Sequence, residues 1–168
     1  GLGAMEYPLA LENHPARVVV TDVDNARLER ARKLITPEAA RQAGVELHYV
    51  NPREHTDQYQ HPMDLTGGAG YDDAFVYAPI RELAALGDRL MAFDGCMNFF
   101  AGPEDSEFRA LIKLYNCHYT STHIMGTTGG HNEDLNEAPH PPAAGAIRPA
   151  AMVTHVGGID SISDATTN

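Results

Sequence analysis

A chain of 168 residues with 43% hydrophobic and 21% charged residues has the size and composition of one globular domain. Its formal net charge of −11 repels nucleic-acid phosphates, and no apolar run reaches the roughly eighteen residues of a membrane span. No basic segment leads into an apolar one at the N-terminus, so a secreted protein is not expected either. Cys96 and Cys117 lack metal-like spacing, and reduced thiols in the cytoplasm are the expectation.

Strands and helices are predicted to alternate along the chain. Residues 17–23 are the clearest strand, because this β-branched run lies between turn-forming residues. Thr36 is expected to cap a short helix that begins at Pro37 and stops at Gly44. The other expected strands are 45–50, 73–77, 95–100 and 118–125, and the other expected helices are 26–34, 80–91 and 108–115. This alternation predicts an α/β fold with a doubly wound parallel sheet.

Turn-rich segments follow three of the predicted strands. They are residues 78–79, 101–103 and 126–130. In a parallel sheet these segments share the carboxyl edge, which is where such folds bind their ligands. The sequence therefore predicts a ligand site at this edge.

Asp22 ends the first predicted strand, about twenty residues after a Gly-Leu-Gly start. In a dinucleotide-binding sheet such a carboxylate accepts hydrogen bonds from the adenosine ribose hydroxyls and repels a 2′-phosphate, which favours NAD over NADP. A turn-forming aspartate is the alternative. Asp24 competes for the role, although a helix N-cap is its more ordinary position. Arg27 is a candidate for stacking on adenine, with a solvated helix charge as the alternative.

The nine histidines predict no metal site. On a strand over 118–125, His118 and His123 would face opposite sides, and the other histidines show no recurrent pairing with cysteine or carboxylate. No serine or cysteine is paired with a base in a pattern that marks a nucleophile. No catalytic residue and no metal ligand is assigned to this chain.

Four segments in order resemble the medium-chain, zinc-type alcohol and polyol dehydrogenases, and the likeness covers nearly the whole chain. The closest similarity is to the branch that contains L-sorbose-1-phosphate reductase and related polyol-phosphate dehydrogenases. The segments are Val18–Arg30, Tyr71–Pro79, Asp94–Pro103 and Tyr115–Gly130, and the similarity continues through Ala150–Gly158.

The resemblance implies a Rossmann-type NAD(P)-binding domain over residues 1–168, with the catalytic GroES-like domain absent. It implies hydride transfer between NAD(P) and a sugar alcohol or ketose phosphate, in a cytoplasmic homo-oligomer, with a catalytic zinc held mainly by the other domain. The cofactor contacts that it implies are Gly1, Asp22, Arg27, Ala78, Pro79, Ala101, Gly102, Thr127 and Thr128.

Two departures from the family pattern carry structural expectations. Gly1 is interpreted as the last glycine of the phosphate-binding turn, and the fold is therefore expected to be truncated at both ends with its first strand missing. A cloning-derived sequence over residues 1–5 is the alternative. Residues 17–23 and 73–77 should then not pair directly. Prolines at 8, 62, 139, 141 and 142 fall where helices are expected, and each would cost about 3 kcal/mol inside a helix.

Two other functions compete with the dehydrogenase reading. A nucleoside-cofactor methyltransferase domain also places an acidic residue after its second strand, but would end in a reversed hairpin after the fifth strand. A non-catalytic remnant that binds only a nucleotide or a partner subunit is the third reading. Thermal stability with NAD, NADP or S-adenosylmethionine distinguishes the three.

Overall fold

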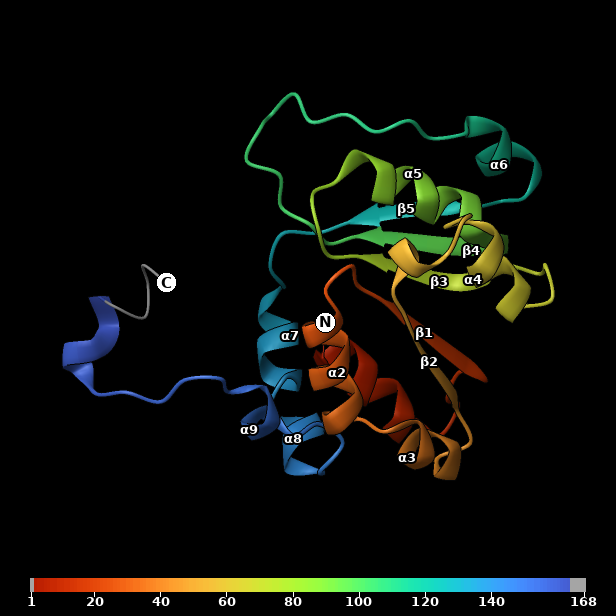
Figure 1. Cartoon of the computed structure of the whole chain (residues 1–168). Helices are drawn as coiled ribbons and strands as arrows, with labels where there is room; N and C mark the ends of the chain where they lie inside the picture. The colour runs from red at the N-terminus through yellow and green to blue at the C-terminus, as the bar shows by residue number, and fades with distance from the viewer. Residues whose placement is uncertain (1, 164–168) are drawn as a thin grey trace. The chain divides into compact units, whose positions relative to one another are not determined.

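The computed structural model describes residues 2–163, whose helices and strands confirm the α/β class (Figure 1). These residues fall into two compact units. The first comprises residues 2–20, 25–49 and 135–163, and the second comprises residues 21–24 and 50–134. Gly1 lies outside the described residues.

The first unit packs helices against a pair of strands. Its elements are α1 (Leu2–Glu6), η1 (Tyr7–Ala10), β1 (Arg17–Thr21), α2 (Asn25–Leu34), α3 (Pro37–Gln42), β2 (Glu46–Val50), α8 (His140–Ala143), α9 (Pro149–Met152) and η3 (Ile159–Ser161). Its core cluster consists of Met5, Ala31, Ile35, Ala40, Val45 and Leu47. Thr36 caps α3 as predicted, because its Oγ1 accepts the amide proton of Ala39 at 3.1 Å.

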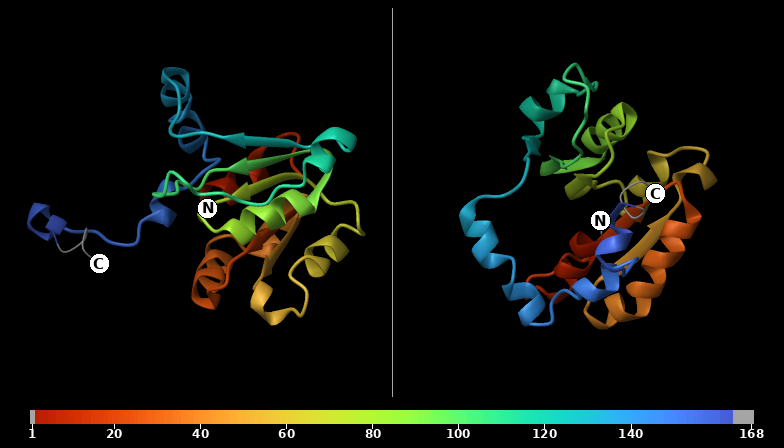
Figure 2. Two further views of the ribbon diagram at one scale, coloured as in Figure 1. Left: turned by 90° about the horizontal axis from the view of Figure 1, so that it is seen from above. Right: turned by 90° about the vertical axis from the view of Figure 1, so that its left-hand side faces the viewer.

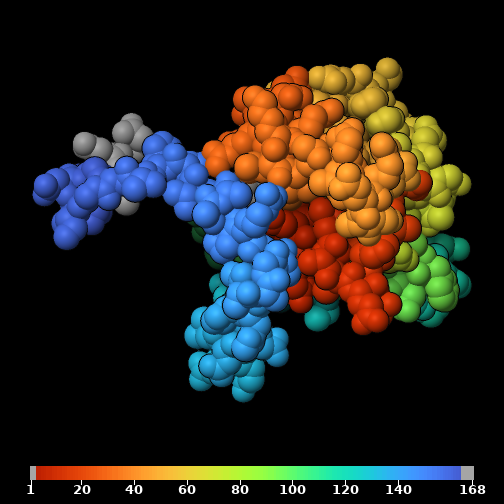
Figure 3. All heavy atoms as spheres, turned by 90° about the horizontal axis from the view of Figure 1, so that it is seen from below, coloured from red at the N-terminus to blue at the C-terminus, as the bar shows by residue number. Residues whose placement is uncertain are grey.

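The late segment of the first unit is tied to the start of the chain by Arg148. Its backbone amide donates to Glu6 at 2.9 Å, its guanidinium pairs with the same carboxylate, and a guanidinium nitrogen donates to the Leu34 carbonyl at 2.9 Å. Figure 3 shows the blue segment that carries Arg148 against the red and orange segments of the same unit. One side chain therefore joins three parts of the chain that are far apart in the sequence.

The second unit holds a three-stranded sheet. Its elements are η2 (Pro52–Glu54), α4 (Gln60–Leu65), β3 (Tyr71–Val76), α5 (Arg81–Leu90), β4 (Met91–Phe99), α6 (Leu114–Tyr119) and β5 (His123–Gly126), and α7 (Asn132–Glu137) follows. The strand order is β3-β4-β5, and both pairings are parallel. Because β5 is parallel to β4, the reversed final hairpin of a methyltransferase is not found among the described strands.

The described strands form two separate sheets, β1-β2 and β3-β4-β5. Among the described strands, β1 and β3 therefore do not pair directly. The observed strand β1 is shorter than the strand predicted over 17–23. It ends at Thr21, and the chain then turns before α2 begins.

Helix α5 covers one face of the β3-β4-β5 sheet through small residues. Ala84 and Gly87 are buried on the sheet side of the helix. A Cβ at Gly87 would lie 2.6 Å from the Met97 sulfur and 3.4 Å from a methyl of Val76. Glycine fits here because a larger residue would force the Met97 side chain to shift.

β4 begins four residues earlier than predicted, at Met91 rather than at residue 95. The register slips between its two ends: Tyr71 pairs with Met91, whereas Asp73 pairs with Cys96. Asp94 adopts a φ of 61° in this irregular stretch, and a Cβ on Gly95 would lie 2.8 Å from the Tyr71 carbonyl oxygen. Such a bulge cannot be read from hydrophobic alternation, because the extra residues break the two-residue period.

The predicted helix over 108–115 is wrong, and the strand predicted over 118–125 is confirmed only in its second half, because β5 begins at His123. Residues 100–113 instead run without a helix along α5, as Figure 1 shows, and α6 occupies Leu114–Tyr119. Side chains of α5 hold this segment, since Arg81 lies over the Phe108 ring at 5.3 Å and Asp88 accepts the Lys113 amide proton. These long-range contacts override the local helical pattern.

The unexpected prolines sit where short helices begin. Pro8 is in the first turn of η1, Pro141 and Pro142 are in the first turn of α8, and Pro139 precedes that helix. Pro62 is the third residue of α4. First-turn amides have no partner within their own helix, so proline removes no hydrogen bond there. The expected penalty is avoided because the helices are short and start at the prolines.

Candidate functional site

The carboxyl ends of β3, β4 and β5 meet at one edge of their sheet, which we call the strand-exit edge. Phe99 pairs with Val76 on one side and with Gly126 on the other. The carbonyl of Val76 accepts the amide protons of both Phe100 and Ala101 at 3.0 Å, which holds two exits side by side. The left view of Figure 2 shows the three parallel strands running side by side to this common edge.

Six of the predicted cofactor residues lie at the strand-exit edge. They are Ala78, Pro79, Ala101, Gly102, Thr127 and Thr128. Pro79, Gly102 and both threonines are exposed, whereas Ala101 is buried. A Cβ on Gly102 would meet no atom within 4 Å, so there is open space at this exit. The edge therefore offers exposed backbone, which is what a dinucleotide approaches in such sheets.

Asp22 belongs to the same unit as these exits. Its backbone amide donates to the Val50 carbonyl at 3.3 Å, and its Oδ1 accepts the amide proton of Asp24 at 2.9 Å. The carboxylate thus takes part in a tight turn and remains partly accessible. Asp24 directly precedes α2, which is the N-cap position predicted for it.

Arg27 and Gly1 are not grouped with the strand-exit edge. Arg27 is exposed on α2, which belongs to the first unit. Gly1 lies outside the described residues, so its predicted role is not addressed by the structure.

An exposed aromatic group beside the edge was not predicted. Phe75, Tyr77 and Phe100 are between 44% and 54% exposed; the rings of Phe75 and Tyr77 stack at 6.3 Å, and Phe100 meets Tyr77 edge-on at 5.6 Å. Phe75 points away from α5, because Val76 faces the helix and neighbours on a strand alternate. Partial burial raises the pKa of the Tyr77 hydroxyl above its usual value. The sequence signal that could have revealed this group is the presence of aromatic residues at the ends of two predicted strands, 73–77 and 95–100.

The same face of the sheet carries Asn98, which pairs in register with Phe75. Its Oδ1 is buried and has no hydrogen-bond partner among the described residues. An unpaired buried acceptor costs about 1–3 kcal/mol of folding free energy. Because Asn98 and Phe75 share this face, the face is polar in part as well as aromatic.

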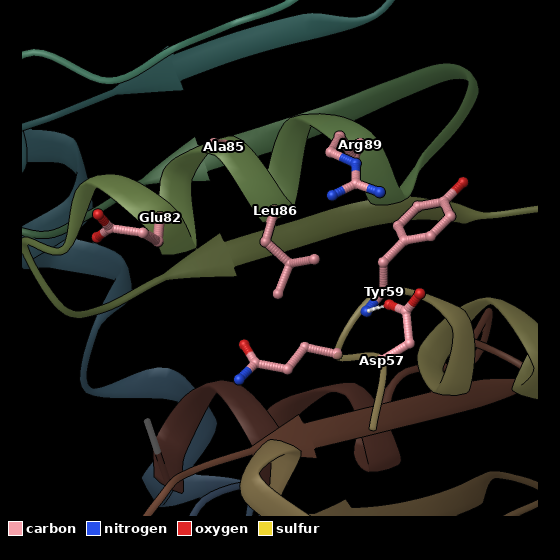
Figure 4. Close-up of a pocket in the computed structure, with 7 residues that line it drawn as sticks. Asp57, Tyr59, Glu82, Ala85, Leu86 and Arg89 are labelled. Atoms are coloured by element: carbon pink, nitrogen blue, oxygen red, sulfur yellow. Dashed lines mark hydrogen bonds between the residues drawn. The ribbon is translucent and has the colours of Figure 1, made fainter. Parts of the chain in front are cut away.

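A shallow cavity of about 320 Å³ lies along the outer side of α5 (Figure 4). It is lined by Asp57, Gln58, Tyr59, Glu82, Ala85, Leu86 and Arg89. The Arg89 guanidinium lies 4.2 Å from the centre of the Tyr59 ring. None of the predicted cofactor residues lines this cavity, so it is separate from the strand-exit edge.

The described residues contain no group of three or more histidine, cysteine, aspartate or glutamate side chains arranged for a metal ion. His118 lies in α6 and only His123 lies in β5, so the prediction that the two histidines lie on one strand is wrong. The His123 imidazole instead pairs with Asp94 at 3.0 Å. None of the helices in residues 2–163 has the length and apolar character that a bilayer crossing requires.

Residues 1–140 match the sequence model of the zinc-binding dehydrogenases. The chain belongs to this family. Among its relatives is the mannitol-1-phosphate 5-dehydrogenase of Aliivibrio fischeri, 45% identical over 161 residues that cover 96% of the chain and 38% of the relative. The L-sorbose 1-phosphate reductase of Klebsiella pneumoniae is 37% identical over 99% of the chain and 39% of the relative.

Solved alcohol dehydrogenases share the fold of this chain. An alcohol dehydrogenase of Escherichia coli CFT073, solved in complex with its cofactor NADH, superposes with a TM-score of 0.70 at 14% identity, over 99% of this chain and 43% of the other. This confirms the Rossmann-like α/β fold. This chain spans about two fifths of the length of the curated relatives that it matches.

Proposed function

We propose that residues 1–168 belong to the NAD(P)-binding domain of a polyol-phosphate dehydrogenase, and that the strand-exit edge binds the cofactor. The observation that carries the proposal is the meeting of three parallel strand exits, with open space at Gly102, in the unit that also holds the Asp22 turn. Dinucleotides bind at such carboxyl edges. A sugar alcohol or ketose phosphate is the proposed substrate, in keeping with the names of the two relatives.

Asp22 is the proposed adenosine-side residue. A carboxylate after the second strand of such a sheet accepts hydrogen bonds from the ribose hydroxyls. Its charge repels a 2′-phosphate, so NAD is the favoured cofactor. Oδ1 already accepts the Asp24 amide, which fixes the carboxylate in the turn.

The chemistry itself belongs to the cofactor, because a bound nicotinamide ring supplies or takes the hydride. This chain's residues bind and orient the dinucleotide at the strand-exit edge. The catalytic zinc typical of the family is assigned to a GroES-like domain of the longer protein, and no residue of this chain is proposed as a zinc ligand. A cytoplasmic homo-oligomer is part of the same proposal.

Titration with NADH, NADPH and S-adenosylmethionine tests the proposal. NADH should bind most tightly, and Asp22→Ala should lower the preference for NADH over NADPH by roughly tenfold, which is about 1.4 kcal/mol. Asp24→Ala is the matched control, since it removes a neighbouring carboxylate and should leave the preference unchanged. Tighter binding of S-adenosylmethionine, or an effect of Asp24→Ala in place of Asp22→Ala, would overturn the assignment.

A further inference from the structure

Asn51 is a buried polar residue directly after β2, and its side chain is engaged at both ends. It is only 8% exposed. Its Nδ2 donates to the Val23 carbonyl at 3.4 Å, and its Oδ1 accepts the amide proton of Arg53 at 3.0 Å. A side-chain amide that is buried and bonded in this way has a fixed orientation, because leaving either end unpaired costs free energy.

The partner of Asn51 is in the turn that carries Asp22. Val23 follows Asp22 directly, and the Asp22 amide is itself bonded to the Val50 carbonyl at 3.3 Å. The exit of β2 thus holds the turn through two successive residues, once through the Val50 backbone and once through the Asn51 side chain. Within the turn, Asp22 Oδ1 accepts the Asp24 amide at 2.9 Å.

We propose that Asn51 is a positioning residue for cofactor selectivity, acting through Asp22. This role of Asn51 rests on the proposed function, because Asn51 can affect selectivity only if Asp22 faces the adenosine ribose. Asn51 carries no charge, so it neither repels a 2′-phosphate nor attracts one. It fixes the main chain on which the Asp22 carboxylate stands, while the adjacent hydrogen bond to Arg53 keeps its amide from rotating.

Asn51→Leu tests this, because leucine has a similar volume and removes both hydrogen bonds without adding charge. The dissociation constants of NADH and NADPH are measured on the whole chain by the fluorescence of the reduced cofactors. The NADPH-to-NADH ratio of these constants should fall several-fold, in the same direction as in Asp22→Ala. In Asn51→Leu/Asp22→Ala the ratio should equal that of Asp22→Ala alone, since both changes act on one carboxylate.

Tyr71→Phe is the matched control, because it removes a side-chain bond to a backbone carbonyl, that of Pro62 at 2.8 Å, in the same unit. The NADPH-to-NADH ratio of Tyr71→Phe should stay at the wild-type value. General destabilisation would then not account for a changed ratio in Asn51→Leu. Asn51→Ser replaces Asn51→Leu if the latter does not fold. An unchanged ratio in the Asn51 variants, with a changed ratio in Asp22→Ala, would refute the positioning role alone. An unchanged ratio in Asp22→Ala as well would refute the proposed function and the inference with it.

Discussion

The carboxylate of Asp88 on α5 accepts the backbone amide proton of Lys113 at 3.0 Å, and Asp88 is only 2% exposed. This bond joins the far end of the segment 100–113 to the helix along which the segment runs. At the other end of α5, Arg81 lies 3.9 Å from Asp105 and stacks on Phe108. The bond to Asp88 is the buried one, and we expect it to contribute more to stability than the exposed ion pair.

Asp88→Ala should lower the free energy of unfolding by about 1–3 kcal/mol, because the Lys113 amide would lose its charged acceptor. Asp88→Asn keeps an acceptor oxygen and should lose less. Urea unfolding followed by circular dichroism measures both, and hydrogen exchange should rise across residues 101–113 in the alanine variant. Equal losses in the two variants would show that charge, and not this hydrogen bond, is what matters.

Gly87→Ala should destabilise the second unit by about 1–3 kcal/mol, because the new Cβ would overlap the Met97 sulfur. Met97 is 1% exposed, so its side chain would have to shift within the core to admit the new Cβ. Shortening it in Gly87→Ala/Met97→Val should recover part of the loss, so that the double variant is more stable than the sum of the single changes predicts. Additive losses would contradict the close approach of α5 to β4.

Tyr49→Phe should destabilise the first unit by about 0.5–1.5 kcal/mol. The Tyr49 hydroxyl donates to the Ile35 carbonyl at 2.7 Å and to the Ala31 carbonyl at 3.2 Å, which satisfies carbonyls near the end of α2. Denaturant midpoints of the two proteins at pH 7 give the difference directly. Phenylalanine keeps the ring, so the contact with Arg32, 5.4 Å from the ring centre, serves as an internal control.

Tyr49 also predicts an alkaline effect. Burial raises its pKa to about 12, against the lowering effect of the Arg32 charge. The neutral hydroxyl is therefore favoured in the folded state, and its contribution is complete below pH 10 and is lost as the pH rises toward 12. Stability measured between pH 9 and about 12 should fall more steeply in the wild type than in Tyr49→Phe. Parallel curves would contradict the raised pKa.

Glu6 predicts an effect at acid pH. Burial alone would raise its pKa, but the backbone and side-chain hydrogen bonds from Arg148 and the charge of that guanidinium outweigh it, so the pKa lies below the ordinary 4.5. The ionised form is favoured by folding, so its contribution is present above pH 4.5 and is lost as the pH falls through the lowered pKa.

Wild type should therefore exceed Glu6→Gln in stability at pH 7, and the difference should shrink below about pH 4.5. Unfolding curves at a series of pH values measure it. Arg148→Gln should show the same pH dependence relative to wild type, because it removes the other partner. A difference that does not shrink as the pH falls below 4.5 would mean that packing, and not the ion pair, holds α1 to the late segment of the chain.

The sequence by itself determined the alternation of strands and helices, the cap at Thr36 and the edge at which three strand exits meet. These features depend on residues close together in the sequence: β-branched runs, turn-forming residues and a hydroxyl before a proline. The family could also be recognised from the sequence, because four motifs occur in order. Asp22 was singled out on the same local basis, as a carboxylate that ends a strand.

The tertiary structure decided what depends on contacts between distant residues. Residues 108–113 form no helix because α5 binds this stretch through Arg81 and Asp88, although its own pattern indicates a helix. The bulge in β4 reflects the approach of Gly95 to Tyr71, which no periodicity reveals. Asn51 was not singled out from the sequence, because its bond to the Val23 carbonyl, 28 residues away, connects it with the Asp22 turn only in the folded structure. Local sequence sets backbone preference, whereas burial and hydrogen bonding across the fold choose among the conformations that this preference allows.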